Sequence, residues 1–218
     1  MKLIFSSLLI GVILMPIFSS RASERPPKPE IDLPAGKAGE TRNAIFAGGC
    51  FWCTEAVFRQ IKGVKSVTSG YAGDTKEKAH YKTVCSGTTN HAEAIRFEYD
   101  PSEISYGQLM QVFMTAHDPT TKNRQGNDIG RQYRSAIFYA NDDEKKVAEA
   151  YIKQLDAAKF FNAPVVTTLE KLTEFFPAED YHQNYVTNNP NQPYVQACSL
   201  PKVYKIREAF KDWLKTEK

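Results

Sequence analysis

The sequence has few of the features that would assign it to a specialised class of protein. Its 218 residues include only four cysteines, and 28 basic against 25 acidic residues leave a net charge of +3. Four cysteines are too few for a disulfide-dense fold in a chain of this length. The weak charge gives no reason to expect nucleic acid or an anionic membrane as a partner. No internal repeat is visible, and the length suits one domain with a sizeable core.

A second paired motif of metal ligands is also lacking. Cys50 and Cys53 form a C-x-x-C pattern, which fits thiol exchange, a peroxidatic pair or half of a zinc site. The other two zinc ligands would have to come from Cys85, Cys198 or four scattered histidines, and none of these forms a second pair. We therefore expect neither a metal nor another cofactor.

Residues 1–22 have the pattern of a signal peptide. Lys2 supplies the positive start, residues 3–18 are almost wholly apolar, and small residues occupy the −3 and −1 positions before a cleavage site after Ala22. We expect export to the periplasm or secretion. The alternative is an uncleaved membrane anchor, because the apolar run just reaches the length that spans a bilayer. No cysteine follows the run, so a lipid anchor is not expected.

The rest of the chain divides into a linker and a domain. Residues 23–40 are rich in Pro, Lys and Glu, which predicts a flexible linker. Residues 41–218 are predicted to form the catalytic domain.

Hydrophobic patterning predicts a β-α-β-β-α-β order for the central elements of this domain. We expect the following strands and helices: strands Asn43–Ala47, Val64–Ala72, Ala92–Tyr99 and Ser135–Tyr139, and helices Phe51–Ile61 and Tyr106–Ala116. This order is typical of an α+β, ferredoxin-like two-layer sandwich.

Other segments are predicted around this core. They are a partly extended Tyr81–Gly87, a long functional loop His117–Gln132, a helix from Asn141 or Asp142 to Ala158, a strand Val165–Leu169, a short helix Pro177–Tyr185, a Pro/Asn-rich tail to Leu200 and a closing helix Pro201–Lys215.

Cys50 is the first candidate for chemistry. An apolar strand runs into Gly48 and Gly49, and Cys50 follows at the start of a helix. Free backbone N–H groups and the helix dipole stabilise an anion there, which lowers the pKa of a thiol. The sequence predicts a nucleophilic Cys50 with Phe51 and Trp52 beside it as apolar walls.

Glu93 and two tyrosines are weaker candidates. A Glu93 side chain in an apolar pocket would have a raised pKa and could hold a proton near neutral pH. The pattern alone favours a position at the surface for Glu93. Tyr81 and Tyr133 border polar segments, and their phenols suit hydrogen bonding to a polarised oxygen, although most tyrosines serve packing.

Segments throughout the chain resemble, in order, those of the A-type peptide methionine sulfoxide reductases. They are Gly49–Trp52, Ser69–Gly73, Tyr81–Gly87, His91–Ala94, His117–Thr120, Asn123–Gly130, Gln132–Ile137 and Phe176–Tyr185. The resemblance implies a ferredoxin-like core and reduction of methionine S-sulfoxide, free or in oxidised proteins, to methionine. It also implies regeneration by a thioredoxin-like reductant, and we expect a monomer.

The resemblance implies a role for each residue of the site. Cys50 matches the nucleophile and Glu93 the acid. The remaining matches are Tyr81 and Tyr133 for the sulfoxide oxygen, Asp128 as a supporting acid, and Phe51 and Trp52 for the substrate's methyl group.

The chain departs from the family pattern at two places that concern a second thiol. Cys53 stands where many relatives have glycine, and Val195 follows Tyr194 where many have cysteine. We predict that Cys53 resolves the Cys50 sulfenic acid, with Cys198 as the second candidate. Cys85 is interpreted as a packing residue.

Two other classes of function remain open from the residues alone. A general thiol–disulfide oxidoreductase would use Cys50 and Cys53 but would have no need of Glu93 and the paired tyrosines. A non-catalytic module that binds methionine-rich partners would have no use for a cysteine at a helix start.

We predict that the exported protein begins at Ser23, because small residues precede the cleavage site at Ala22. Intact-mass analysis of the exported protein tests this directly. A mature chain that still begins at Met1 would instead favour the membrane anchor.

Overall fold

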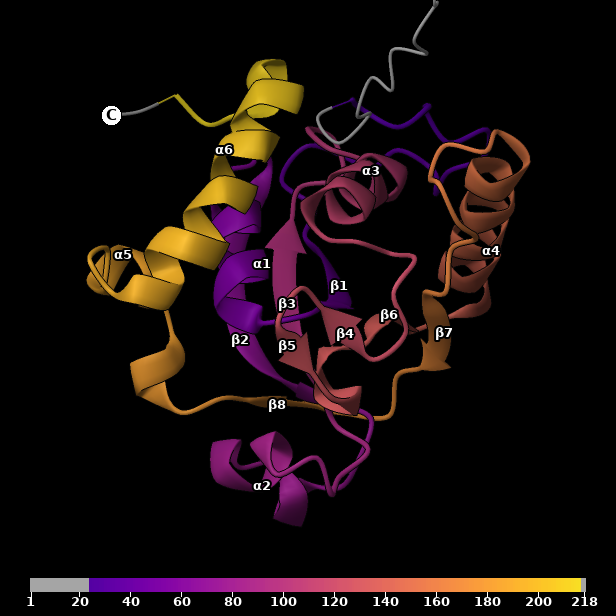
Figure 1. The fold of residues 1–218 in the computed structure, drawn as a ribbon. Helices are drawn as coiled ribbons and strands as arrows, with labels where there is room; N and C mark the ends of the chain where they lie inside the picture. The colour runs from indigo at the N-terminus through magenta and orange to yellow at the C-terminus, as the bar shows by residue number, and fades with distance from the viewer. Residues whose placement is uncertain (1–23, 217–218) are drawn as a thin grey trace, which may run out of the picture.

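The computed structural model describes residues 24–216, so the predicted signal peptide lies outside the described residues. One six-stranded sheet, in the order β7-β6-β1-β3-β2-β8, forms the centre of the molecule (Figure 1). Its strands are β1 (Arg42–Gly48), β2 (Val64–Ala72), β3 (Ala92–Tyr99), β6 (Ser135–Tyr139), β7 (Thr168–Lys171) and β8 (Phe175–Pro177). Neighbouring strands are antiparallel except β6 and β7, which are parallel.

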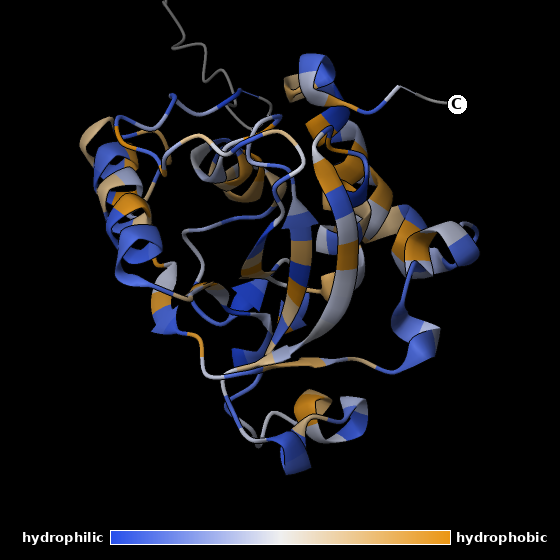
Figure 2. Ribbon diagram, turned by 180° about the vertical axis from the view of Figure 1, so that it is seen from behind, coloured by the Kyte–Doolittle hydropathy of each residue, from blue (hydrophilic) through white to orange (hydrophobic). Residues whose placement is uncertain are grey.

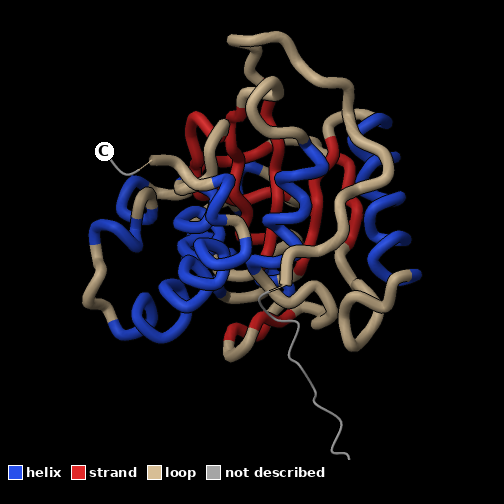
Figure 3. The backbone as a smooth tube through the Cα atoms, turned by 90° about the horizontal axis from the view of Figure 1, so that it is seen from above, coloured by secondary structure: helices blue, strands red, loops and turns tan. Residues whose placement is uncertain are grey.

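Helices flank the strands in the view from above (Figure 3). The α-helices are α1 (Phe51–Arg59), α2 (Tyr81–Cys85), α3 (Tyr106–Ala116), α4 (Asp142–Ala157), α5 (Tyr185–Asn188) and α6 (Leu200–Ala209). The mixed α+β class expected from the sequence is therefore confirmed.

Alternation along the central strand β1 fills two hydrophobic clusters. Ala44 and Phe46 point into a large cluster that the sheet shares with α1, α3, α4 and α6. Ile45 and Ala47 point to the opposite face, into a smaller cluster built mostly from alanines. Figure 2 shows this alternation of hydrophobic and hydrophilic residues along the strands. Both faces of the sheet centre are thus buried.

Helix caps agree with the sequence. Asn141 is the N-cap of α4, and its side chain accepts a hydrogen bond from the Glu144 N–H. It is one of the two residues, Asn141 and Asp142, at which the sequence predicted the start of this helix. Ser105 begins α3 with a reciprocal pair of hydrogen bonds to Gln108.

Several predicted segments have a different structure. Residues 81–87, expected to be partly extended, begin with α2, whose first N–H at Tyr81 donates to the Glu179 carboxylate. The long loop holds a small hairpin of β4 (Arg124–Gln125) and β5 (Asp128–Ile129). The strand expected at Val165–Leu169 begins three residues later, as β7, and ends two residues later. These short elements are fixed by tertiary contacts, which local pattern does not carry.

The last part of the chain differs most. The helix expected at Pro177–Tyr185 is replaced by β8, a 3₁₀ turn at Asp180–His182 and α5. The expected tail contains a π-helix, Val195–Ser199, that runs directly into α6. The closing helix ends at Ala209 and a 3₁₀ turn, Lys211–Trp213, follows it.

Residues 24–40, expected to be a flexible linker, lie against the domain. The Arg25 guanidinium is stacked on Phe210 and Trp213 and pairs with Asp212. The backbone carbonyl oxygens of this segment accept hydrogen bonds from α3 and α4, among them Gln111 Nε2 to Pro26 O and Tyr151 OH to Pro27 O.

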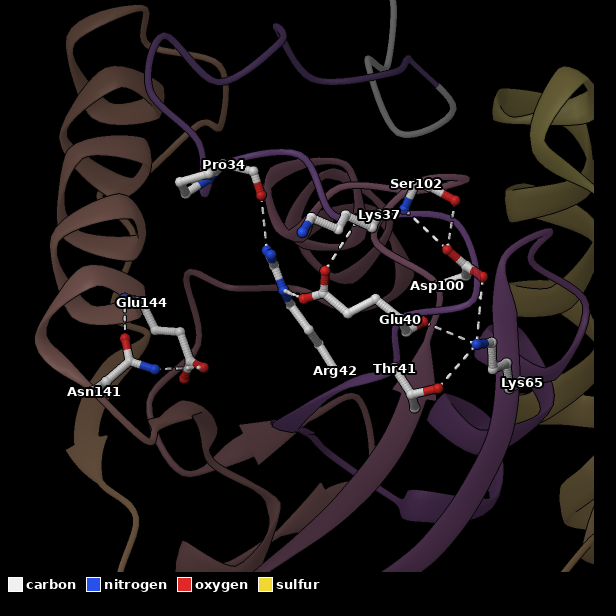
Figure 4. A network of polar contacts seen from close by, with 10 residues as sticks. All are labelled: Pro34, Lys37, Glu40, Thr41, Arg42, Lys65, Asp100, Ser102, Asn141 and Glu144. Atoms are coloured by element: carbon white, nitrogen blue, oxygen red, sulfur yellow. Dashed lines mark hydrogen bonds and ion pairs between the residues drawn. The ribbon is translucent and has the colours of Figure 1, made fainter.

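Further polar contacts hold the end of this segment to the start of β1. Arg42 donates to both Glu40 and the Pro34 carbonyl, and Lys65 bonds the Glu40 carbonyl and Thr41 (Figure 4). Residues 24–40 therefore act as a strap over the helices, which we call the N-terminal strap. Among residues 24–216, no helix has both the length and the apolar character needed to cross a membrane.

Candidate active site

Two glycines bring Cys50 to the start of α1. Gly49 has a φ of 89°, and a Cβ there would lie 2.6 Å from Cγ of Gln125, so only glycine fits this turn. Cys50 is the N-cap residue of α1, and its carbonyl accepts from the Cys53 and Thr54 N–H groups. The sharp turn and the helix-start position are as the sequence predicted.

A pocket opens beside the Cys50 sulfur. Its volume is ≈ 250 Å³, and it is lined by Cys50, Phe51, Trp52, Tyr81, Glu93, Asp128, Tyr133, Gln192 and Tyr194. These residues come from α1, α2, β3, the β4–β5 hairpin and the segments around it, and the last part of the chain. The fold thus brings together seven predicted site residues that are spread over more than eighty positions.

Glu93 is buried and faces this pocket, not the surface that its pattern alone favoured. Its side chain is 2 % exposed, and its Oε2 accepts a hydrogen bond of 3.0 Å from the Phe51 N–H. Burial raises the pKa of Glu93 to about 8, with smaller contributions from the charges of Asp128 and Cys53. Glu93 is therefore protonated at neutral pH and can donate a proton.

Cys85 lies against the same carboxyl group. Its sulfur donates to Glu93 Oε1 at 4.0 Å, and burial raises the pKa of this thiol to about 11. The side chain is partly buried, and the packing role expected for Cys85 stays a prediction.

Cys50 and Cys53 are buried free thiols three residues apart at the start of α1, and each shifts the pKa of the other. Burial raises the pKa of Cys50 well above its usual value. The hydrogen bond from Cys50, together with the Lys202 charge and Ser199, lowers the pKa of Cys53 to about 6. Burial of Cys50 thus opposes the low pKa that its helix-start position predicts, and the lowered pKa belongs to Cys53.

The two predicted tyrosines stand around the opening beside Glu93. Tyr81 and Tyr133 are both half-buried, and burial raises the pKa of each above its usual value, so both phenols remain protonated donors. Their hydroxyl groups interact with Cys85. Two O–H donors and a neutral carboxylic acid thus converge on one space beside a sulfur.

Aromatic rings form the other wall of the pocket. Trp52 stacks on Tyr185 with ring centroids 3.7 Å apart, and its Nε1 donates to His182 Nδ1 at 3.0 Å. Phe51 is fully buried, and its ring lies 5.1 Å from that of His182. Trp52 is therefore held in one orientation, with an apolar face available to a ligand.

Sequence reasoning missed two tail residues of the pocket, Tyr194 and Gln192. The Tyr194 hydroxyl donates to Asp128 Oδ2 at 2.5 Å, and it also reaches both thiols. Burial raises the pKa of Tyr194 far above its usual value. The only sequence signal for Tyr194 was its position before Val195, where many relatives have a cysteine.

Cys198 lies near the thiol pair but not in the pocket. Its neighbour Ser199 contacts Cys53 Sγ at 3.2 Å, and the π-helix holds both residues. Burial and the Cys53 charge raise the pKa of Cys198. The two candidate resolving thiols are thus connected through Ser199, which contacts the Cys53 sulfur and follows Cys198 in the chain.

Glu179 was also missed, although it stands in a quoted segment. Its two oxygens accept from the Tyr81 N–H and the Tyr71 hydroxyl, both at 2.9 Å. The carboxylate thereby fixes the start of α2, and with it the position of Tyr81. Within residues 24–216, no three His, Cys, Asp or Glu side chains gather in a way that would hold a metal ion.

Comparison with protein families gives one match that covers most of the chain. Residues 42–214 match the family model described as peptide methionine sulfoxide reductase.

Individual relatives are similar over nearly their whole lengths. Peptide methionine sulfoxide reductase MsrA 2 of Synechocystis sp. is 44% identical over 212 residues, which cover 97% of this chain and 98% of the relative. Peptide methionine sulfoxide reductase MsrA of Chromobacterium violaceum is 52% identical over 167 residues, 77% of this chain and 95% of the relative.

Solved structures agree with these relatives. Mxr1 from Saccharomyces cerevisiae in reduced form is 32% identical with a TM-score of 0.63, over 74% of this chain and 93% of that one. Methionine sulfoxide reductase A of Corynebacterium diphtheriae is 33% identical with a TM-score of 0.60, over 78% of this chain and 85% of that one.

The raised pKa of Glu93 predicts a stability that falls as pH rises. Its pKa is about 8 in the folded protein against 4.5 as a reference for the unfolded chain. Between these values the unfolded state releases a proton that the folded state keeps, so this contribution is complete below pH 4.5 and lost as pH rises through about 8. The slope is at most about 1.4 kcal/mol per pH unit.

Urea unfolding of the reduced protein from pH 5 to 9 measures this slope. In Glu93→Gln, which does not titrate, the loss of free energy should be smaller over that range. Glu174→Gln, at an exposed glutamate, serves as the control and should follow the wild type. Parallel pH curves for wild type and Glu93→Gln would contradict the prediction.

Proposed function

Because the chain belongs to the peptide methionine sulfoxide reductase family, we propose that it reduces methionine S-sulfoxide, free or in oxidised proteins, to methionine. The observation that carries this proposal is the joint lining of one pocket by the Cys50 sulfur, the protonated Glu93 carboxyl and the phenols of Tyr81 and Tyr133. A sulfoxide has an electrophilic sulfur and a basic oxygen, so it needs a nucleophile and proton donors at the same place.

In the first step, the Cys50 sulfur attacks the sulfoxide sulfur. The oxygen receives the proton of Glu93 while Tyr81 and Tyr133 donate hydrogen bonds to it. Transfer of that hydroxyl to sulfur leaves methionine and a Cys50 sulfenic acid, so the substrate is reduced by two electrons and Cys50 is oxidised by two.

Cys50 must lose its own proton as it attacks. Cys53, whose pKa is lowered by its interaction with Cys50, is the neighbouring group that takes this proton as a thiolate in the proposed step. This arrangement supplies a nucleophile at neutral pH although burial raises the pKa of Cys50. Cys53 is a thiol after this step, and Glu93 is a carboxylate.

In the second step, Cys53 attacks the sulfenic acid. The new S–S bond replaces the S–O bond, and the hydroxyl leaves as water with the proton of the Cys53 thiol. A dithiol reductant of the thioredoxin class then reduces the disulfide and restores both thiols. Glu93 recovers its proton from solvent.

The pocket walls account for the choice of substrate. Phe51 and Trp52 offer an apolar surface for the methyl group of methionine sulfoxide, and the hydrogen bond that Trp52 Nε1 donates to His182 keeps the Trp52 ring in place. Asp128 orients the Tyr194 hydroxyl at the rim.

The enzyme is proposed to act as a monomer after export from the cytoplasm, with residues 1–22 as the removed segment.

We also propose that the sheet centre has the ferredoxin-like arrangement. Support comes from the antiparallel strand order β6-β1-β3-β2, with α1 between β1 and β2 and α3 between β3 and β6. In this description β7 and β8 extend the sheet at its two edges.

Cys50 is predicted to be the only cysteine essential for the first turnover, whereas loss of the Cys53 base should slow that turnover without abolishing it. Each cysteine is replaced by Ser, and methionine is quantified after reduced enzyme is mixed with a peptide that contains methionine S-sulfoxide, without reductant. Wild type should give one equivalent per enzyme, and Cys50→Ser none, because Cys50 is the only cysteine among the residues that line the pocket. Methionine formation by Cys50→Ser would disprove the assignment.

Glu93→Gln and Cys85→Ser complete this series. Glu93→Gln should slow the first turnover by about 10²-fold or more, as is typical when a general acid is lost. Cys85→Ser retains a donor to Glu93 and serves as the matched control.

Cys53 is predicted to form the first disulfide, because residues three apart on a helix share a face and the two thiols act on each other. After one equivalent of sulfoxide, peptide mapping should find a Cys50–Cys53 link in wild type and in Cys198→Ala. A Cys50–Cys198 link in wild type, with normal thioredoxin-supported turnover in Cys53→Ala, would transfer the resolving role to Cys198.

A further inference from the structure

The Cys53 sulfur has polar neighbours. A glycine, which many relatives have at this position, has no side chain that such neighbours could contact. The Cys53 side chain is fully buried at the start of α1, and the Ser199 hydroxyl lies 3.2 Å from its sulfur. Ser199 is itself fully buried and has no other side-chain partner among the described contacts. A buried hydroxyl needs a hydrogen-bond partner, and the Cys53 sulfur is the one it has.

Lys202 adds a positive charge on the same side. Ser199 and Lys202 are three residues apart where the π-helix meets α6, so they share one helix face. The Lys202 charge acts on the Cys53 sulfur and lowers the pKa of that thiol. The segment that joins the π-helix to α6 therefore places one hydroxyl and one cation near a buried sulfur.

We propose that Ser199, supported by Lys202, is a positioning residue that holds Cys53 as a thiolate directed at Cys50, and so sets the rate of disulfide formation. The inference rests on the proposed function, in which Cys53 resolves the sulfenic acid. Ser199 donates its O–H to the Cys53 sulfur and does not touch the substrate. It acts on the second step, when Cys53 must give up the proton it received in the first.

Other titratable groups also face the Cys53 sulfur. They are Cys50, Glu93, Tyr194, Cys198 and Lys202. Of these, only Lys202 is a cation, and after the first step Glu93 is negative. Negative charge near Cys53 opposes its ionisation, which makes the contribution of Ser199 and Lys202 larger in this step.

The test separates the two steps in one experiment. Reduced enzyme is mixed with one equivalent of a peptide that contains methionine S-sulfoxide, and methionine and disulfide are quantified over time from pH 5 to 9. In Ser199→Ala the rate of disulfide formation should fall about tenfold more than the rate of methionine formation, with sulfenic acid trapped by dimedone in the interval. The pH of its half-maximal rate should rise by about one unit.

Two further variants distinguish the hydrogen bond from packing. Ser199→Thr keeps the hydroxyl and should restore most of the rate and the pH profile. Ser66→Ala, which removes an exposed hydroxyl on β2, should behave as wild type in both steps. Lys202→Gln should shift the pH profile in the same direction as Ser199→Ala, whereas Lys211→Gln at an exposed lysine should leave it in place.

Each outcome decides the inference. Equal disulfide rates and pH profiles in wild type and Ser199→Ala, with a Cys50–Cys53 link in both, overturn it while the proposed function stands. If Ser199→Ala does not fold, an unshifted profile in Lys202→Gln overturns it instead. A Cys50–Cys198 link in the wild type overturns the inference, because Cys53 would then not be the resolving thiol. A wild type that forms no methionine overturns the proposed function as well.

Discussion

The hydrogen bond from the Phe51 N–H to Glu93 Oε2 is the contact on which the site depends. A helix start leaves N–H groups without partners, and a buried carboxyl group needs donors, so each satisfies the other. The bond joins the first residue of α1 to the second residue of β3, which sets the acid beside the Cys50 sulfur. Because one oxygen accepts this bond, the proton that burial retains is available on the other oxygen, towards the pocket and Cys85.

The last part of the chain completes what this bond begins. The Tyr194 hydroxyl donates a hydrogen bond to Asp128 at the pocket, and the Ser199 hydroxyl contacts the Cys53 sulfur. Both belong to or adjoin the π-helix, whose wider turn continues into α6 and packs along α1. The N-terminal strap fixes the far end of the same unit, because Arg25 stacks on Phe210 and Trp213 beyond α6. Both ends of the described chain thus contribute to the position of the second thiol.

The charge of the thiol pair links fold to chemistry. A helix start favours an anion, but burial of Cys50 disfavours one, whereas at Cys53 the interaction with Cys50, the Lys202 charge and Ser199 offset burial. The lowered pKa therefore belongs to a thiol one helical turn from the nucleophile, which takes the proton of Cys50 in the proposed mechanism. The π-helix and α6 contribute to this difference, because they bring Ser199 and Lys202 to one thiol and not to the other.

The sequence by itself determined the central elements, the glycine turn before Cys50, the Asn141 cap and seven of the residues that line the pocket, because these depend on local periodicity, backbone freedom and recognisable motifs. It could not place Tyr194, Glu179 and Ser199, whose partners are 66, 98 and 146 residues away, or the strap, whose composition indicated flexibility. It also assigned the low pKa to Cys50 rather than Cys53. Only the tertiary structure decided these points, because burial and the neighbours of a side chain depend on which distant segments pack against it.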